Sequence, residues 1–174
     1  VWVNELRLKE HNNKGGWAAN ANLNVQLSDF GSVNATGRYV SEGFGGLEDG
    51  VASRSTDNYG TYSVTTSLEM GKFFPDKAKV SIPLYYSVTK EKTSPKYNPM
   101  DTDMELKDAL DAAGSKAERD SIENIAVTKV TQTNFSVSNA RVGIATKRHP
   151  MPYDPANFSF TYSHAHQHTT GETT

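Results

Sequence analysis

Cysteine is absent from this chain of 174 residues, which excludes disulfide cross-links, cysteine-ligated zinc and thiol catalysis. Long hydrophobic runs are also missing, and no apolar stretch approaches the ~20 residues that a membrane-spanning helix requires. Neither sign of charge is in large excess. The 18 basic and 20 acidic residues leave a formal net charge of −2, which argues against nucleic acid as a partner. Position 1 is Val and no signal peptide follows, so we expect an internal or processed start.

The residues that are present favour β structure. Aromatic residues make up 10% of the chain, which is too many for a disordered segment. Hydrophobic residues make up 36%, which is few for a dense soluble core. Apolar and polar residues alternate strictly from Ala19 onwards. Leu23, Val25 and Leu27 have one parity, and the other parity belongs to a set of amides: Asn20, Asn22, Asn24 and Gln26. Successive side chains of a strand point to opposite faces, so this run predicts a strand with one apolar and one amide-rich face.

Similar runs predict further strands at residues 1–8, 33–39, 62–70, 80–88, 127–144 and 158–166. The strand at 80–88 has Val80, Ile82 and Leu84 on its apolar face. Pro83 cannot donate to a β ladder and therefore predicts a bulge or an unpaired position there. A slip of parity predicts a second bulge near Asn139.

The predicted connections alternate in length. Residues 29–32 and 73–78 form tight turns and residues 147–156 a short proline-rich link, whereas residues 41–57 and 90–124 form long loops. The second long loop has the only helical pattern, which starts near Met104. We expect Asp101 and Asp103 at its N-terminus, where negative charge is favourable, and a break into two helices at Gly114-Ser115.

Long alternating strands, short turns opposite long loops, and aromatic residues near the strand ends are together typical of a transmembrane β-barrel. The aromatic residues fall into a long-loop group (Trp17, Tyr39 and Tyr59) and a tight-turn group (Phe30, Phe73, Phe74, Tyr153 and Phe158). The predicted fold is all-β, with antiparallel up-and-down strands and one helical excursion. Residues 1–174 would form a single segment of barrel wall. A soluble β-sandwich also alternates in this way and remains an alternative.

The number of strands limits the barrel. Six long strands are fewer than the eight of the smallest single-chain bacterial barrels, so the chain would be part of a larger one. Its apolar residues (Leu23, Val25, Leu27, Val80, Ile82 and Leu84) would face lipid. Its amides (Asn20, Asn22, Asn24 and Gln26) would face the lumen.

No pattern of catalytic residues is evident, so an enzyme and a cofactor are not expected. His164, His166 and His168 share one face of the last predicted strand and are a weak candidate for metal binding, because no further ligand is implied. The acidic residues of 101–123 lie beside lysines and arginine, which is typical of a solvated helix face. The glycines of 43–50 match no phosphate-binding motif.

Several longer segments carry a family resemblance. They are GGWAANANLNVQLSDF (15–30), GFGGLE (43–48), LEMGKFFP (68–75), KVSIPLYYS (79–87), PKYNP (95–99), KAERDSI (116–122) and PMPYDPANF (150–158), together with the opening VWVNELRL. In this order they resemble the SprA/Sov family of Bacteroidetes gliding motility and type IX secretion. The resemblance implies the outer membrane as location and a protein-conducting channel formed by one very large barrel.

The same resemblance implies partners: secreted cargo proteins, plug and shuttle subunits of the secretion system, and outer-membrane lipid. No nucleotide or metal chemistry is expected in the channel. Two other functions remain open. One is a generic outer-membrane porin or adhesin that binds through residues 90–124. The other is a soluble carbohydrate-binding sandwich with Trp17 and Tyr59 as stacking residues.

Overall fold

The computed structural model describes residues 15–50, 53–75, 78–143 and 151–171. The predicted strand at residues 1–8 lies outside these ranges. The long strands are β1 (Ala18–Leu27), β2 (Gly31–Val40), β3 (Asp57–Glu69), β5 (Pro83–Pro95), β8 (Thr128–Val142) and β9 (Phe160–Thr170). The short strands are β4 (Val80–Ser81), β6 (Tyr97–Asn98) and β7 (Asp101–Glu105). The helices are α1 (Leu106–Ala112) and α2 (Lys116–Ala126), and two 3₁₀ helices span Met70–Phe73 and Pro155–Asn157.

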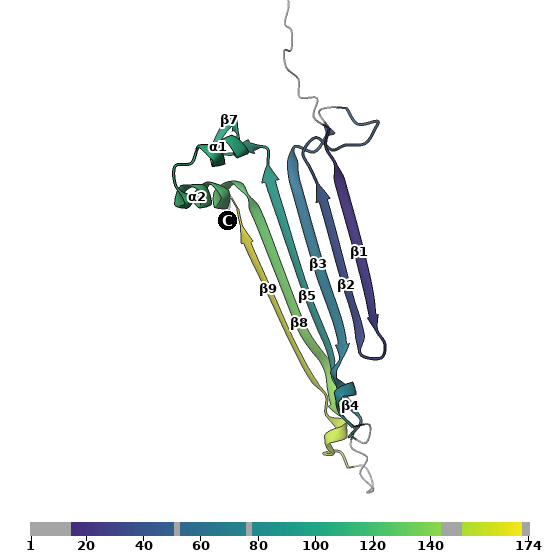
Figure 1. The fold of residues 1–174 in the computed structure, drawn as a ribbon. Coiled ribbons are helices and arrows are strands. Elements are labelled where there is room, and N and C mark those ends of the chain that lie inside the picture. Colours follow the sequence, from purple (N-terminus) through teal and green to yellow (C-terminus); the bar gives the residue numbers. More distant parts are fainter. Residues whose placement is uncertain (1–14, 51–52, 76–77, 144–150, 172–174) are drawn as a thin grey trace, which may run out of the picture.

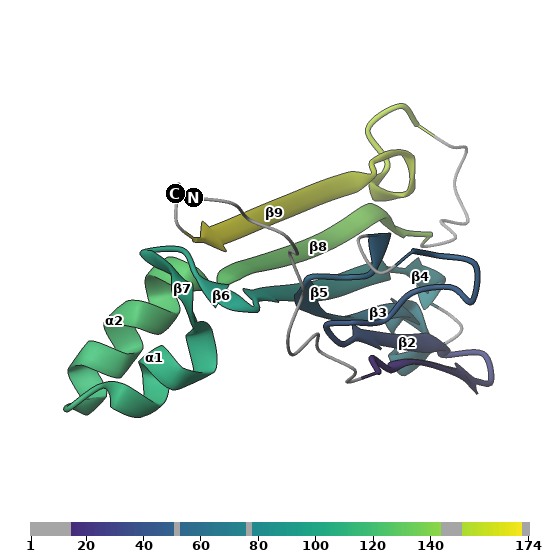
Figure 2. The ribbon, with the colours of Figure 1, turned by 90° about the horizontal axis from the view of Figure 1, so that it is seen from above.

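The six long strands form one open antiparallel sheet in the order β1-β2-β3-β5-β8-β9, with β4 also pairing with β8 (Figure 1). Each long strand therefore pairs with the next long strand along the chain. This order confirms the predicted up-and-down arrangement. Seen from above, the sheet is a single layer, and the two helices stand to one side of its end (Figure 2).

Both predicted irregularities are present. The strand at 80–88 is interrupted at Ile82, so that β4 pairs only with β8 while β5 starts at Pro83. Asn139 has a φ of 54°, and the register of β8 with β9 shifts between Val137 and Ala140. A proline without an N–H and an extra residue in one strand both disrupt a ladder locally.

Glu69 compensates for the interruption at Ile82. Its Oε1 accepts hydrogen bonds from the backbone N–H groups of Ile82 (2.7 Å) and Gly71 (3.2 Å), and its Oε2 accepts from the Ser81 hydroxyl (3.4 Å). A single carboxylate thus satisfies two amides that have left the regular ladder.

The prediction for Asp101 and Asp103 was wrong. Both belong to β7, which pairs with β6, and α1 begins only at Leu106. The long loop is also shorter than predicted, because β5 continues to Pro95, where it pairs with Asp57 at the start of β3. The predicted break at Gly114-Ser115 is confirmed. The Ser115 hydroxyl accepts from the Glu118 N–H and caps α2.

The buried apolar cluster of the described residues lies between the two helices rather than on the sheet. Leu106, Ala126 and Val127 are buried together, with Leu110 and Ile122 against them. Among the described residues, no helix has both the length and the apolarity to cross a membrane.

Candidate functional site

The two faces of the sheet differ sharply in chemistry. In an antiparallel sheet, residues directly opposite one another lie on the same face, so the register arranges the side chains in rows across the strands. The apolar face is defined here as the face that carries Leu23, Val25 and Leu27. Its central rows are Leu23-Ala35-Val64-Val88-Thr133-His166, Val25-Val33-Thr66-Tyr86-Phe135-His164 and Leu27-Gly31-Leu68-Leu84-Val137-Tyr162.

The opposite, polar face is built mainly from amides and hydroxyls. Its central rows are Asn22-Thr36-Ser63-Thr89-Gln132-Gln167, Asn24-Asn34-Thr65-Ser87-Asn134-Ala165 and Gln26-Ser32-Ser67-Tyr85-Ser136-Ser163. No residue in these three rows is charged. Side chains bond across strands, with 3.0 Å between the Ser63 and Thr89 hydroxyls and 3.1 Å from the donating Gln132 Nε2 to the Gln167 Oε1.

The apolar face is not covered by other parts of the described chain. Leu23 is 61% exposed, Val25 38% and Leu27 40%, although Leu23 and Val25 lie inside a regular strand and Leu27 ends it. A contiguous apolar surface of this kind marks contact with lipid or with another protein. Leu84 lies on this face, opposite Leu68 and Val137. Two other residues were predicted to face lipid. Val80 of β4 pairs with Val142 of β8, and Ile82 lies between β4 and β5.

The apolar character weakens towards β9. His164, His166 and His168 are opposite Phe135, Thr133 and Thr131, on the same face as Leu23. Within the described ranges, no group of three or more His, Asp or Glu side chains is placed to hold a metal ion.

Aromatic side chains gather at both ends of the strands. At the long-loop end, the Trp17 and Tyr39 rings lie 4.7 Å apart between centroids. At the tight-turn end, the Phe30 and Phe73 rings lie 5.3 Å apart. Tyr59, which we grouped with Trp17, pairs with Val40 and therefore lies on the polar face, away from Tyr39.

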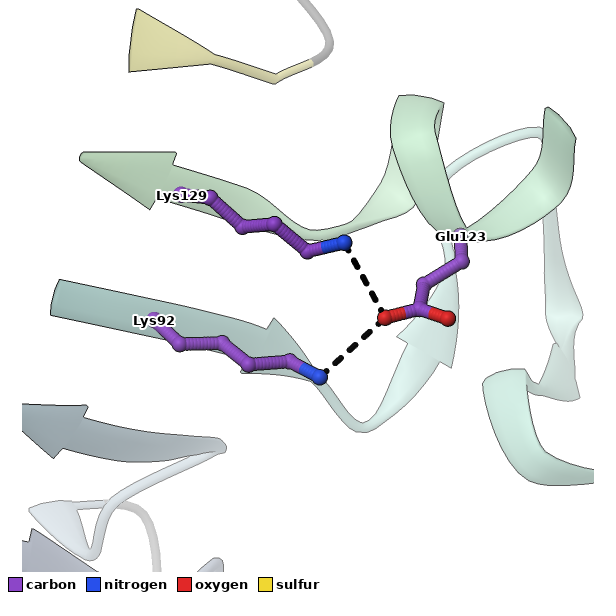
Figure 3. A network of polar contacts seen from close by, with 3 residues as sticks. All are labelled: Lys92, Glu123 and Lys129. Atoms are coloured by element: carbon purple, nitrogen blue, oxygen red, sulfur yellow. Dashed lines mark hydrogen bonds and ion pairs between the residues drawn. The ribbon is translucent and has the colours of Figure 1, made fainter. Parts of the chain in front are cut away.

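Three lysines, Lys90, Lys92 and Lys129, lie on the apolar face at the long-loop end and are together called the lysine row, although they occupy two neighbouring register positions. Lys92 on β5 is directly opposite Lys129 on β8, and Lys90 is in the next row towards the centre of the sheet. Glu123 of α2 reaches between the first two, and its Oε1 lies 3.1 Å from each Nζ (Figure 3). Hydrogen bonds donated by Lys129 and Lys92 lower the pKa of the Glu123 carboxyl below its usual 4.5. This contact ties α2 to the edge of the apolar face.

The apolar face is hollowed next to these lysines. The hollow has a volume of about 980 Å³, and its lining includes Ala21, Gly37, Gly60, Tyr62 and Lys90. The hollow exists because Ala21, Gly37 and Gly60, on three neighbouring strands, have a small side chain or none. A Cβ at Gly37 would meet nothing within 4 Å, and the Lys90 Nζ lies 5.9 Å from the centre of the Tyr62 ring.

Sequence reasoning missed the lysine row and its partner Glu123. Lys90 and Lys92 have the same parity as Val88, which would have placed them on the apolar face if the strand had been extended beyond residue 88. The contact of Glu123 with two strands has no such local signal, because it depends on how α2 folds back against the sheet.

Comparison with known families decides the relationship of the chain. Residues 1–110 match the SprA_N family, described as motility related/secretion protein. The chain belongs to this family. The match confirms the SprA resemblance seen in the sequence and relates the chain to motility and secretion. A comparison with curated proteins finds no match.

Proposed function

We propose that this chain is a wall segment of the outer-membrane protein-conducting channel of type IX secretion, and that it is needed for export of surface proteins and for gliding motility. The observation that carries the proposal is the division of one sheet into an uncovered apolar face and a polar face whose three central rows are uncharged. SprA_N membership supports the link to secretion and motility.

The dimensions of the sheet support a position in a membrane. A strand that crosses the hydrocarbon layer at a tilt of about 45° needs roughly 9–11 residues. The six long strands have from 10 residues, in β1 and β2, to 15 residues, in β8. Aromatic pairs at both ends of the strands match the two interfacial belts of membrane barrels.

The unpaired edges support a wall that continues beyond these strands. In the described part of the chain, β1 and β9 each pair with a neighbour along one side only. Lipid cannot hydrogen-bond to a free strand edge, so a sheet in a membrane has to be closed. Further strands would therefore pair with β1 and β9 in the channel.

The polar face suits the passage of proteins. Its central rows offer amides and hydroxyls, which hold water at the wall without a fixed charge that would attract one class of cargo. In this proposal the partners are secreted cargo inside the channel, plug and shuttle subunits of the secretion system, and lipid outside. No cofactor and no catalytic residue are needed.

A surface adhesin is the second candidate, because α1 and α2 stand to one side of the long-loop end of the sheet with many exposed polar residues. A carbohydrate-binding sandwich is not supported. The described residues contain no second sheet packed on the first. Tyr59 also lies on the opposite face from Tyr39, whose ring is next to Trp17, so Trp17 and Tyr59 do not form one stacking surface.

Depletion of the protein in the source cells, combined with fractionation, tests the proposal. An antibody against residues 101–124 should detect a band far above 19.1 kDa in the outer membrane, and depletion should cause surface proteins to accumulate inside the cells. A porin or adhesin would give the membrane band without the accumulation. A soluble band near 19 kDa would contradict both functions.

A further inference from the structure

The lysine row lies where an apolar surface meets a charged one. Lys90, Lys92 and Lys129 are on the apolar face, one or two rows beyond Val64 and Val88. Glu123 contacts two of them. Among the described residues, no carboxylate lies within 4 Å of the Lys90 ammonium, because Glu91 next to it in β5 is on the polar face. The cluster therefore has three positive charges and one negative charge.

We propose that the hollow beside Lys90 is a binding site for the phosphate headgroup of a membrane lipid, with the lipid's acyl chains along the apolar rows of β1, β2 and β3. The inference rests on the proposed function, since it needs the apolar face to look at lipid. It adds a defined site and a charged headgroup to what would otherwise be a uniform lipid contact.

The charge pattern selects an anion. A lysine ammonium is a compact point charge that binds phosphate well, and charge-assisted hydrogen bonds are about twice as strong as neutral ones. Basic pockets at membrane depth on other proteins hold phosphorylated headgroups for this reason. Glu123 holds the ammonium groups of Lys92 and Lys129 together at one oxygen (Figure 3), and both lysines are among the residues that line the hollow.

The shape of the hollow selects a lipid rather than a free anion. Ala21, Gly37 and Gly60 carry small side chains or none, which leaves space for the hollow. The next row towards the tight-turn end is Leu23, Ala35 and Val64, and the row after it has Val25 and Val33 beside Thr66. A lipid whose headgroup binds at Lys90 would thus place its acyl chains against exposed apolar side chains, and covering that apolar surface stabilises the bound state. Tyr39 and Tyr62 border the same space, as interfacial tyrosines do.

Binding of a fluorescent phosphatidic acid to the full-length protein in nonionic detergent tests the site. Lys90→Gln should weaken binding about tenfold, the loss of roughly one charge-assisted contact. Gly37→Ile fills the hollow without a change of charge and should weaken binding by a similar factor. Lys72→Gln, at the opposite end of the sheet and 3.9 Å from Asp29, is the matched control and should leave binding unchanged.

Three results would overturn the site. They are unchanged binding in both Lys90→Gln and Gly37→Ile, equal binding of the uncharged diacylglycerol, and displacement of the lipid by inorganic phosphate at similar concentration, which would indicate a soluble anion site. Labelling of cysteines in β1 separates this from the proposed function. If Val25 faces lipid and both Lys90→Gln and Gly37→Ile bind normally, only the headgroup site fails, whereas a Val25 that faces water removes the basis of both.

Discussion

Neighbouring residues of β1 have opposite surroundings in this structure. Val25 is in a row with Val33, Thr66, Tyr86 and Phe135, and Asn24 is in a row of amides and hydroxyls on the other face. The two residues differ in face but share strand, depth and neighbours in sequence. They therefore form a matched pair for testing which face is in contact with lipid.

Arginine at these two positions should give different results. Val25→Arg should cost ~2–4 kcal/mol if the residue lies at mid-bilayer, because a guanidinium would have to be placed in hydrocarbon. Asn24→Arg should be mild, because the side chain would extend into water. The amount of full-length protein recovered from the membrane fraction measures the difference. Equal recovery of the two variants would mean that the faces are assigned wrongly.

Glu69 offers a second test at the scale of one residue. Glu69→Ala should leave the Ile82 N–H without its acceptor and lower the free energy of local opening at the tight-turn end by about 1–3 kcal/mol. Glu69→Gln keeps a carbonyl acceptor at the same position and should lose less. Hydrogen exchange of the Gly71 and Ile82 amides reports the effect, and identical exchange in Glu69→Ala and the unchanged protein would show that the contact contributes nothing.

At the scale of elements, α2 is held to the sheet by charge as well as by its small core. Glu123 contacts Lys92 and Lys129 on two different strands, while Ala126 and Val127 bury the end of the helix. Exposed ion pairs of this kind contribute about 0.2–1 kcal/mol each. The helix position should therefore respond to pH without loss of the sheet.

The direction of the pH response follows from the lowered pKa of Glu123. A carboxyl whose pKa is lower in the folded state stabilises that state above its ordinary pKa of 4.5, and this contribution is lost as the pH falls through the lowered value. Hydrogen exchange in α2, corrected for the intrinsic rate, should therefore accelerate below pH 4.5. Glu123→Gln should abolish this change, and Asp120→Asn on the same helix should keep it. Retention of the full change in Glu123→Gln would assign it to another group.

The elements differ in how far the sequence could predict them. Strict alternation located β1, β2 and β9, because the period of two is a local signal that needs no knowledge of neighbours. The ends of β3 and β5 were missed, since Asp57 and Pro95 extend the strands only because they pair with each other. Asp101 and Asp103 read as a helix start on charge alone, but the pairing of β7 with β6 outweighed that preference.

The functional surface was predictable only in part. The two faces of β1 follow from its own sequence, and the register then extends them across six strands. The lysine row and the hollow depend on residues from β1, β2, β3, β5 and β8 that come together only in the sheet. A single sequence has no local pattern for such a site.

At the scale of the whole molecule, the sheet is unusual in having large apolar side chains exposed along one face while its core lies elsewhere. Exposure of Leu23, Val25 and Leu27 to water would be unfavourable, and contact with lipid would remove that cost. Within the described ranges, β1 and β9 each also have one unpaired edge, whose backbone groups need hydrogen-bond partners. Both features are accounted for together if the sheet is one part of a closed wall in a membrane.

Cysteine labelling along β1 tests this account most directly. The 174 residues contain no cysteine, so single substitutions at positions 22–27 can be compared in the full-length protein in its native membrane, with the unsubstituted protein as background. A charged, membrane-impermeant maleimide should label positions 22, 24 and 26, and a lipid-soluble reagent should favour positions 23, 25 and 27. Equal labelling of both sets by the charged reagent would contradict a wall with one face in water and the other in lipid.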